Sequence, residues 1–335
     1  MRRAWKLWLG IAISAVSMFL MLRGVSFKDL RASVASADPI WAAPALVCFV
    51  LTIGGRAWRW SLLMDKTPLG ATFHAMNIGY MLNMTLPFRL GEVARAYVIG
   101  ARTSTSMTRA FSGVVLERLL DLATVVLLFV LFAQAVPMPE ALSKAAAIGA
   151  ALVVAMMLAG AFVVLRAATA RRWFVEPVAK RLSKARADFL LGKFDEVTSS
   201  FRSIGSPGRV AAVLALTVWI WGANVVLTWA ALEAFLPGTL QQAGLVMVVA
   251  NLGGAVPSAP GGLGLVQGFA TTALVVPFGV PADKAVAFAF VWTISQQLLL
   301  IALGAVGLMR IGMTLSEVRD AGAQPAKPAD APASR

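Results

Sequence analysis

Charged residues, cysteine and histidine are all scarce in this 335-residue chain. Charged residues make up 14% of it, against about a quarter in soluble globular domains, while hydrophobic residues make up 59% and the mean hydropathy is +0.77. The single cysteine, Cys48, excludes an intramolecular disulfide and a thiolate cluster. The single histidine, His74, has no neighbouring ligands in the sequence, so we expect no metal site and no cofactor. This composition excludes the soluble globular class and indicates an integral membrane protein.

Long apolar runs dominate the rest of the sequence. Six of them contain about 20 residues each, which is the length of helix that crosses a hydrocarbon core about 30 Å thick. They predict an all-α integral membrane protein with six transmembrane helices. The runs are Trp5–Leu22, Ile40–Leu63, Ala110–Phe132, Leu142–Leu165, Val210–Phe235 and Ala285–Met309.

Basic residues are concentrated between the fourth and fifth runs. Ten Lys and Arg lie between residues 166 and 209, and the positive-inside rule assigns this loop to the cytoplasm, together with the N-terminal Arg2, Arg3 and Lys6. We expect both termini in the cytoplasm and the protein in the bacterial inner membrane. The net charge of +14 then reflects topology and not nucleic-acid binding. Recruitment of anionic lipid is the alternative role of the loop.

Two further apolar segments, Phe73–Gly100 and Thr239–Pro277, are interrupted by proline and glycine at Pro87–Glu92 and Pro257–Gly264. Proline breaks a helix, and each charge at the bilayer centre costs about 2.5–3.5 kcal/mol on insertion scales. A crossing by the first segment would also put the basic loop on the wrong side. We therefore predict two re-entrant broken-helix hairpins, whose irregular backbone is buried in protein or faces a water-filled cavity.

The two interrupted segments occupy matching positions in the chain. Pro87 follows Ile40 by 47 residues, and Pro257 follows Val210 by the same number. We predict a single membrane domain over residues 1–310, with an inverted repeat of about 40–132 and 210–309, and a disordered cytoplasmic tail over 311–335. Paired breaks in inverted halves indicate a transport site near the midplane. The alternative is that proline and glycine are simply common in membrane helices.

The third apolar run contains Glu117, Arg118 and Asp121, which are spaced to share one helical face. Their expected partners in the first hairpin are Arg89, Glu92 and Arg95. Two interpretations remain open. The charges form a salt-bridge lock between the hairpin and the third helix, or they bind a lipid headgroup or gate its path, because arginine can hold phosphate bidentately and the helix N-terminus at Gly91 offers backbone N–H groups. Arg56 and Arg59, with Trp58 and Trp60, are interpreted as an interfacial anchor.

Four motifs, in this order, resemble the flippase-like membrane domain of the lysylphosphatidylglycerol synthase family, also called the UPF0104 group. They are Arg56-x-x-Arg59-Trp60, Asn83-x-x-x-Pro87-x-Arg89-x-Gly91-Glu92-x-x-Arg95, Glu117-Arg118-x-x-Asp121 and Pro257-x-x-Pro260-Gly261-Gly262-x-Gly264. The resemblance implies lipid translocation. It does not imply synthesis, because the family's aminoacyl-transferring part is a soluble C-terminal domain and this chain ends about 25 residues after its last apolar run. Many relatives carry Glu at the position of Gln267, which puts proton coupling there in doubt.

We therefore expect a lipid translocase that moves a phospholipid or another anionic or isoprenoid-type lipid between leaflets. The alternatives are a secondary transporter of a soluble anion and an integral membrane enzyme acting on a lipid-linked substrate. The sequence offers no Asp-x-Asp motif and no histidine acid–base pair, so we expect no enzymatic activity. The expected partners are membrane lipids, chiefly anionic ones. A lipid-synthesis enzyme is a candidate protein partner, and we expect no binding of nucleic acid. The candidate site residues are Asn83, Pro87, Arg89, Gly91, Glu92, Arg95, Glu117, Arg118, Asp121, Pro257, Ser258, Pro260, Gly261, Gly262 and Gln267.

Overall fold

The computed structural model is helical, without a strand among the residues that it describes. Four helices are long and apolar enough to cross a membrane, so the chain is an all-α, multi-pass membrane protein, as the sequence predicts. These four are Pro39–Leu63, Pro207–Glu233, Pro260–Phe278 and Ala282–Ile311. The described residues are 27–65, 67–85, 90–133, 166–203, 206–255 and 260–318, with the isolated positions 19, 151, 155, 159, 162 and 163.

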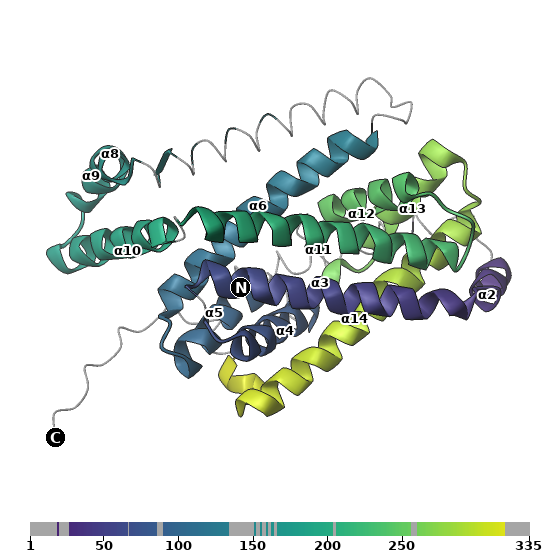
Figure 1. Ribbon diagram of the computed structural model, residues 1–335, viewed down its shortest axis with the longest axis horizontal. Coiled ribbons are helices and arrows are strands. Elements are labelled where there is room, and N and C mark those ends of the chain that lie inside the picture. The colour runs from purple at the N-terminus through teal and green to yellow at the C-terminus, as the bar shows by residue number, and fades with distance from the viewer. Residues whose placement is uncertain are drawn as a thin grey trace.

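The helices form two similar sets with a smaller helical pair between them (Figure 1). The first set follows α2 (Phe27–Ala35) and η1 (Pro39–Trp41), and consists of α3 (Ala42–Leu63), α4 (Leu69–Thr85), α5 (Gly91–Arg102) and α6 (Met107–Ala133). The intervening part consists of α8 (Ala167–Ala170), η3 (Arg171–Val175), α9 (Glu176–Ala179) and α10 (Lys184–Ser203). The second set consists of α11 (Pro207–Glu233), α12 (Leu240–Ala255), η4 (Pro260–Gly262), α13 (Leu265–Phe278) and α14 (Ala282–Ile311).

The expected count of six spans is met only in part. Helices α3, α11 and α14 correspond to three of the expected spans. The expected span Ala110–Phe132 lies within α6, but three charged residues interrupt its apolar stretch, so α6 is not among the four candidates. The fourth candidate, Pro260–Phe278, lies in a segment that we expected to turn back within the membrane. The expected spans Trp5–Leu22 and Leu142–Leu165 fall almost entirely outside the described residues.

Helices α3 and α11 pack antiparallel along their length. At one end the rings of Trp41 and Trp229 lie 5.3 Å apart, and the Asp38 N–H donates to the Ala234 carbonyl over 2.8 Å. At the other end, Leu63 packs against Val213. The two sets therefore run through the bundle in opposite directions from their first helices onward.

The helix contacts of the first set recur in the second. Helix α3 contacts α4, α4 contacts α5, α5 contacts α6 and α3 contacts α6; α11 to α14 make the corresponding contacts with one another. Between the sets, α4 packs on α14, and the corresponding α12 packs on α6. The main helix contacts therefore correspond between the two sets, and α11 additionally contacts α6.

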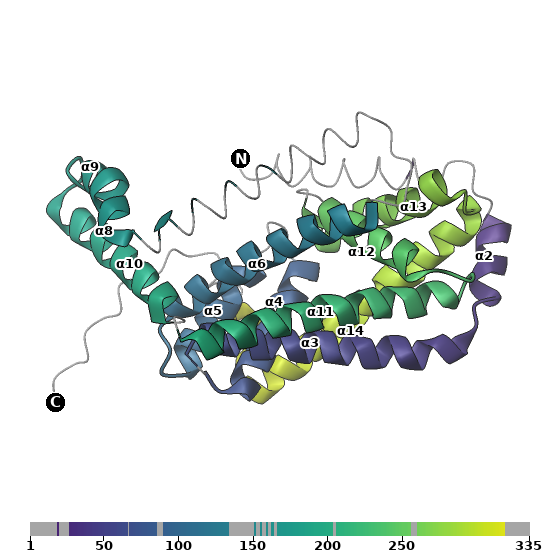
Figure 2. The ribbon, with the colours of Figure 1, turned by 45° about the horizontal axis from the view of Figure 1, so that its top comes forward.

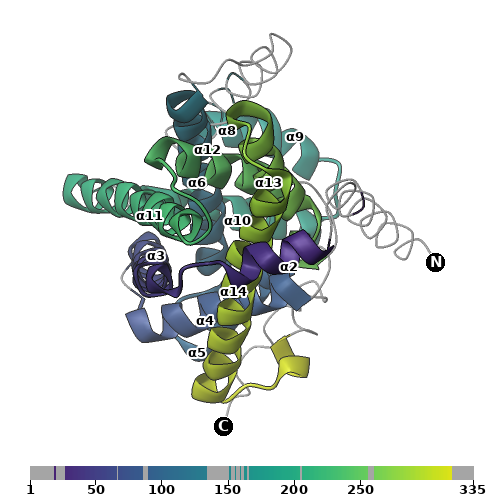
Figure 3. The same cartoon turned by 90° about the vertical axis from the view of Figure 1, so that its right-hand side faces the viewer.

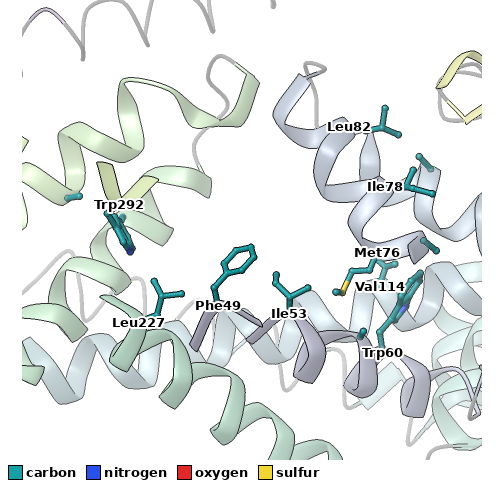
Figure 4. Packing of buried hydrophobic residues seen from close by; sticks show 14 of the residues in the cluster. Phe49, Ile53, Trp60, Met76, Ile78, Leu82, Val114, Leu227 and Trp292 are labelled. Atoms are coloured by element: carbon teal, nitrogen blue, oxygen red, sulfur yellow. The ribbon is translucent and has the colours of Figure 1, made fainter. Parts of the chain in front are cut away.

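Large apolar side chains fill the core of the bundle, and a small residue lets two of its helices approach closely. Phe49, Ile53 and Trp60 point from one face of α3 into the main hydrophobic cluster (Figure 4). On α14, a Cβ at Gly304 would overlap Met81 of α4 and would lie 2.8 Å from the Asn77 carbonyl oxygen. A larger residue at Gly304 would therefore separate α14 from α4.

Both ends of the bundle are closed by specific contacts. At the end where α3 begins, α2 packs on the start of α14, and the Ser33 hydroxyl donates to Asp283 over 2.8 Å (Figure 3). At the other end, Asp65 follows α3 and pairs with Arg209 at 2.8 Å and with Arg109 at 3.4 Å. We call this second end, where α3 ends and α6 and α11 begin, the basic end.

The C-terminal tail begins as an ordered segment. Helix α14 ends at Ile311 and is followed by Gly312, whose φ of 66° suits a glycine at a helix C-terminus. Val318, which the sequence assigned to the disordered tail, has a side chain that is 0% exposed within the main hydrophobic cluster. Residues 319–335 of the expected tail lie outside the described residues.

Candidate functional site

A cluster of arginines and carboxylates lies inside the bundle, toward the basic end. It joins α3, α5 and α6, and α11 contributes polar partners. Its members are Arg56, Arg59, Glu92, Arg95, Glu117, Arg118 and Asp121, which we call the charge cluster.

Asp121 connects α6 with α3 and α11. Its two carboxylate oxygens accept hydrogen bonds from Arg59 at 2.7 Å and from Arg56 at 3.1 Å. The Trp221 indole N–H of α11 donates to the same carboxylate at 3.3 Å, and Arg59 also donates to the Thr217 hydroxyl at 3.2 Å. Asp121 therefore fixes the relative positions of three helices.

Glu117 lies one helical turn earlier and connects α6 with α5. It accepts hydrogen bonds from Arg95 at 3.2 Å and from its neighbour Arg118 at 2.9 Å. Arg95 reaches back along its own helix to Glu92 at 2.7 Å, and its guanidinium lies 4.7 Å from the centre of the Trp60 ring. This stacked, doubly paired arginine holds the first hairpin against α6.

The members of the cluster differ sharply in exposure. Arg59 and Glu117 are 0% exposed and Arg95 is 1% exposed, whereas the side chain of Arg118 is 40% exposed. Arg118 still lies 3.5 Å from Glu92 and 3.7 Å from Asp121. Arg118 therefore carries the most exposed guanidinium of the charge cluster.

The charges of the cluster do not cancel. Its described members comprise four guanidinium groups and three carboxylates, which leaves one positive charge in surplus. In addition, the Nε–H groups of Arg59, Arg95 and Arg118 are buried and meet no acceptor among the described residues. A buried surplus charge with unused donors is costly unless an anion compensates it.

The two interrupted segments meet where η4 contacts the end of α4. Gln297 of α14 donates to the Gly261 carbonyl at 2.9 Å, and a Cβ on Gly261 would lie 3.3 Å from the Met84 sulfur at the end of α4. Gly261, Gly262 and Gly264 have φ values of 68°, 67° and 82°, a backbone region that favours glycine. The break after Pro260 therefore depends on glycine to reach α4.

An amide side chain caps the helix that follows each break. Asn83 accepts the Gly91 N–H at 2.9 Å before α5, and Gln267 accepts the Gly264 N–H at 2.7 Å before α13. Gln267 also donates to the Thr293 hydroxyl of α14 at 2.9 Å. The Gly91 N–H, which we expected to be available to an anion, is therefore already used within the protein.

The charge cluster and both helix breaks lie in a region that matches a known protein family. The family model described as "Lysylphosphatidylglycerol synthase TM region" matches residues 7–304, which include the first helix set, the second set as far as Gly304 of α14, and the whole charge cluster. The chain belongs to this family. Its recognition from the four sequence motifs is confirmed.

Two relatives extend the comparison. A UPF0104 membrane protein of Methanothermobacter thermautotrophicus is 25% identical over 330 residues, covering 92% of this chain and 96% of the relative. A glycosyltransferase, AglD, of Haloferax volcanii is 26% identical over 120 residues, covering 35% of this chain but only 19% of that protein. No solved structure matches.

These findings correct our expectation of no enzymatic activity. The family takes its description from a synthase, and one of the similar proteins is named as a glycosyltransferase. The absence of familiar catalytic motifs from the sequence was therefore not a sufficient reason to exclude an enzyme.

Within the family's membrane region, the structure brings most of the predicted site residues into two groups. Glu92, Arg95, Glu117, Arg118 and Asp121 join the charge cluster, as expected. The helix breaks hold Asn83, Gly91, Pro260, Gly261, Gly262 and Gln267. Outside the described residues lie Pro87, Arg89, Pro257 and Ser258.

The interpretation of Arg56 and Arg59 as an interfacial anchor was wrong. Arg59 and Trp60 are 0% exposed, and both arginines bind Asp121. Only Trp58, at 55% exposure, faces outward as an anchor would. The available signal was the spacing of three residues, which puts both arginines on one face of a helix that is otherwise apolar.

Proposed function

We propose that this chain is a lipid translocase that carries an anionic lipid headgroup along a path formed by the charge cluster and the two helix breaks. The observation that carries the proposal is the surplus positive charge of the cluster, which is exposed at Arg118 in a bundle that is otherwise apolar. A lipid phosphate supplies the missing negative charge, and its oxygens can accept hydrogen bonds from an arginine fork. The acyl chains remain in the bilayer.

The arrangement of the helices supports an inverted repeat with re-entrant hairpins. The antiparallel packing of α3 on α11, and the contact pattern shared by the two sets, are what a twofold axis in the membrane plane would produce. We further propose that the basic end faces the cytoplasm, because the basic segment 166–209 joins the bundle there. The interrupted segments would then enter from opposite sides.

Single-cysteine labelling tests this topology. In a Cys48→Ser background, we expect Thr239→Cys to react with an impermeant maleimide in intact cells and Ser104→Cys to stay unlabelled until the membrane is opened. Both positions are exposed, and they lie at opposite ends of the bundle. The reverse pattern would invert the orientation, and labelling of both positions in intact cells would contradict the inverted repeat.

Arg118→Lys tests the headgroup contact. Lysine keeps the charge but loses the planar fork, so we expect folding close to normal and translocation reduced roughly 10- to 100-fold, the equivalent of one charge-assisted hydrogen bond. The measurement is the dithionite quenching of NBD-labelled phosphatidylglycerol in proteoliposomes, normalised to folded protein by size-exclusion chromatography.

Arg109→Lys is the matched control. Arg109 lies on the same helix, its side chain is 32% exposed and it also pairs with a carboxylate, yet it lies outside the cluster. We expect it to translocate normally. Full activity of Arg118→Lys would remove the headgroup contact from the proposal, and uptake of radiolabelled inorganic phosphate without lipid movement would favour a transporter of soluble anions.

A second candidate function is an enzyme that modifies a lipid headgroup. It is favoured by the description of the family and by the similarity to the glycosyltransferase AglD over 120 residues. Mass spectrometry of lipids from the same proteoliposomes separates the candidates, because modification changes the lipid's mass and translocation does not. A new lipid mass that depends on Arg118 would favour the enzyme.

A further inference from the structure

The helical pair between α6 and α11 projects from the basic end of the bundle (Figures 1 and 2). Its first arm is formed by α8, η3 and α9, and its second arm is α10. Arg171 of the first arm pairs with Asp195 of the second at 2.8 Å, and α10 contacts α6. The pair is therefore a defined helical hairpin, which we call the basic hairpin, over residues 166–203.

Large apolar side chains are exposed on the basic hairpin. Trp173 is 63% exposed, and Phe174 and Phe189 are each 60% exposed. Val178 and Leu182, at 52% and 39%, extend the apolar surface along the turn between the arms. Large exposed aromatic side chains of this kind on a hydrophilic segment indicate contact with another molecule or a membrane.

Basic side chains accompany these aromatics. The basic hairpin contains nine Lys and Arg against four Asp and Glu, a surplus of five positive charges. Arg172, Lys180, Arg181 and Lys184 are exposed beside the apolar residues. A topology signal requires only positive charge and does not explain the exposed Trp173. Aromatic and basic residues together are the composition of a segment that lies in the headgroup region of an anionic bilayer.

A ring contact locates this surface relative to the membrane. The rings of Trp173 and Phe162 lie 6.3 Å apart, and Phe162 belongs to the apolar run Leu142–Leu165. Trp173 thus lies beside the end of an apolar run of membrane-spanning length, which is where tryptophan occurs in membrane proteins.

We propose that the basic hairpin docks on the anionic lipid surface at the basic end, with Trp173 and Phe174 inserted among the headgroups and the neighbouring basic residues on the phosphates. This role is separate from translocation, because it uses none of the charge-cluster residues.

The test uses the full chain with Cys48→Ser and Phe174→Cys, labelled with NBD and reconstituted in nanodiscs. With phosphatidylglycerol present, we expect blue-shifted emission and strong quenching by lipids carrying a nitroxide near the headgroup. Pure phosphatidylcholine, or NaCl at about 0.5 M, should reverse both effects, because screening weakens the contact. The expected difference in quenching between the two lipid compositions is at least about twofold.

A charge variant, Arg172→Gln/Lys180→Gln/Lys184→Gln, serves as the matched comparison. We expect it to lose the dependence on phosphatidylglycerol while its melting temperature and the labelling of Ser104→Cys stay unchanged, which shows that fold and topology are retained. Quenching of the Phe174 label by aqueous iodide, equal in both lipid compositions, would overturn the proposal. Emission that depends on protein concentration instead of lipid composition would also overturn it and would assign the surface to a second copy of the chain.

Discussion

Glu117→Gln is expected to destabilise the protein by about 3–5 kcal/mol, because it leaves the buried Arg95 with Glu92 alone and raises the surplus positive charge of the cluster from one to two. The side chains of Glu117 and Arg95 are at most 1% exposed. The reverse change, Arg95→Gln, leaves Glu117 with the half-exposed Arg118 as its nearest partner and should cost a similar amount. Thermal unfolding in detergent measures both.

The double variant tests whether the two residues act as a pair. We expect Arg95→Gln/Glu117→Gln to lose clearly less stability than the sum of the single variants, because neither uncompensated charge remains. Asp65→Asn is the control: its carboxylate also pairs with arginine, but its side chain is 48% exposed, so the change should cost about 1 kcal/mol or less. Additive losses in the double variant would mean that Arg95 and Glu117 stabilise the fold independently.

Gly91→Ala is expected to destabilise the first hairpin by about 1–3 kcal/mol, because the added methyl group would overlap the Gly79 carbonyl oxygen of α4. The obstacle is backbone, which cannot rotate away as a side chain can. The Asn83 side chain also lies 2.6 Å from the new methyl group, so its hydrogen bond to the Gly91 N–H would be distorted.

Gly54→Ala is the matched control for Gly91. Gly54 lies within α3, and a Cβ there would meet nothing within 4 Å. Alanine is a better helix former than glycine by about 1 kcal/mol, so this variant should be neutral or slightly more stable. Equal melting temperatures for the Gly91 and Gly54 variants would contradict the close approach of α4 and α5.

The sequence predicted those parts of the site that depend on local spacing. Glu117 and Asp121 are four residues apart on one helix, and Arg95 precedes them in a segment broken by proline, so a cluster around α6 was foreseeable. The helix break at Pro257–Gly264 was equally predictable, from its proline and glycine residues. Helical spacing indicates the face of a helix on which a residue lies, and Glu117 and Asp121 both join the charge cluster, as predicted.

The partners across the bundle were not predictable in this way. Asp121 binds Arg59 over 62 positions in sequence and Trp221 over 100. Neither contact follows from spacing, because it depends on how α3 packs on α11. Arg56 and Arg59 were misinterpreted because arginine and tryptophan near a span end are typical of an interface. Their spacing of three residues indicates a shared helix face, but it does not identify Asp121 as the carboxylate that both bind.

The expected six spans are confirmed only in part, for a different reason. Charges within α6 were judged tolerable in a spanning helix, but three of them interrupt its apolar stretch, so α6 is not among the four candidate spans. The helix after Pro260, which contains no charged residue, is among them. The charges of α6 pair with charges on neighbouring helices, which the sequence of α6 alone does not reveal.

The charges of α6 also have a consequence for biogenesis. On insertion scales, a charge at the centre of a membrane helix costs about 2.5–3.5 kcal/mol, and α6 carries Glu117, Arg118 and Asp121 within its apolar stretch. Their partners Arg59 and Arg95 precede them in the chain and are therefore synthesised first. We therefore expect α6 to enter the membrane together with α3 and α5 and not alone, because the order of synthesis supplies Glu117 and Asp121 with their counter-ions beforehand.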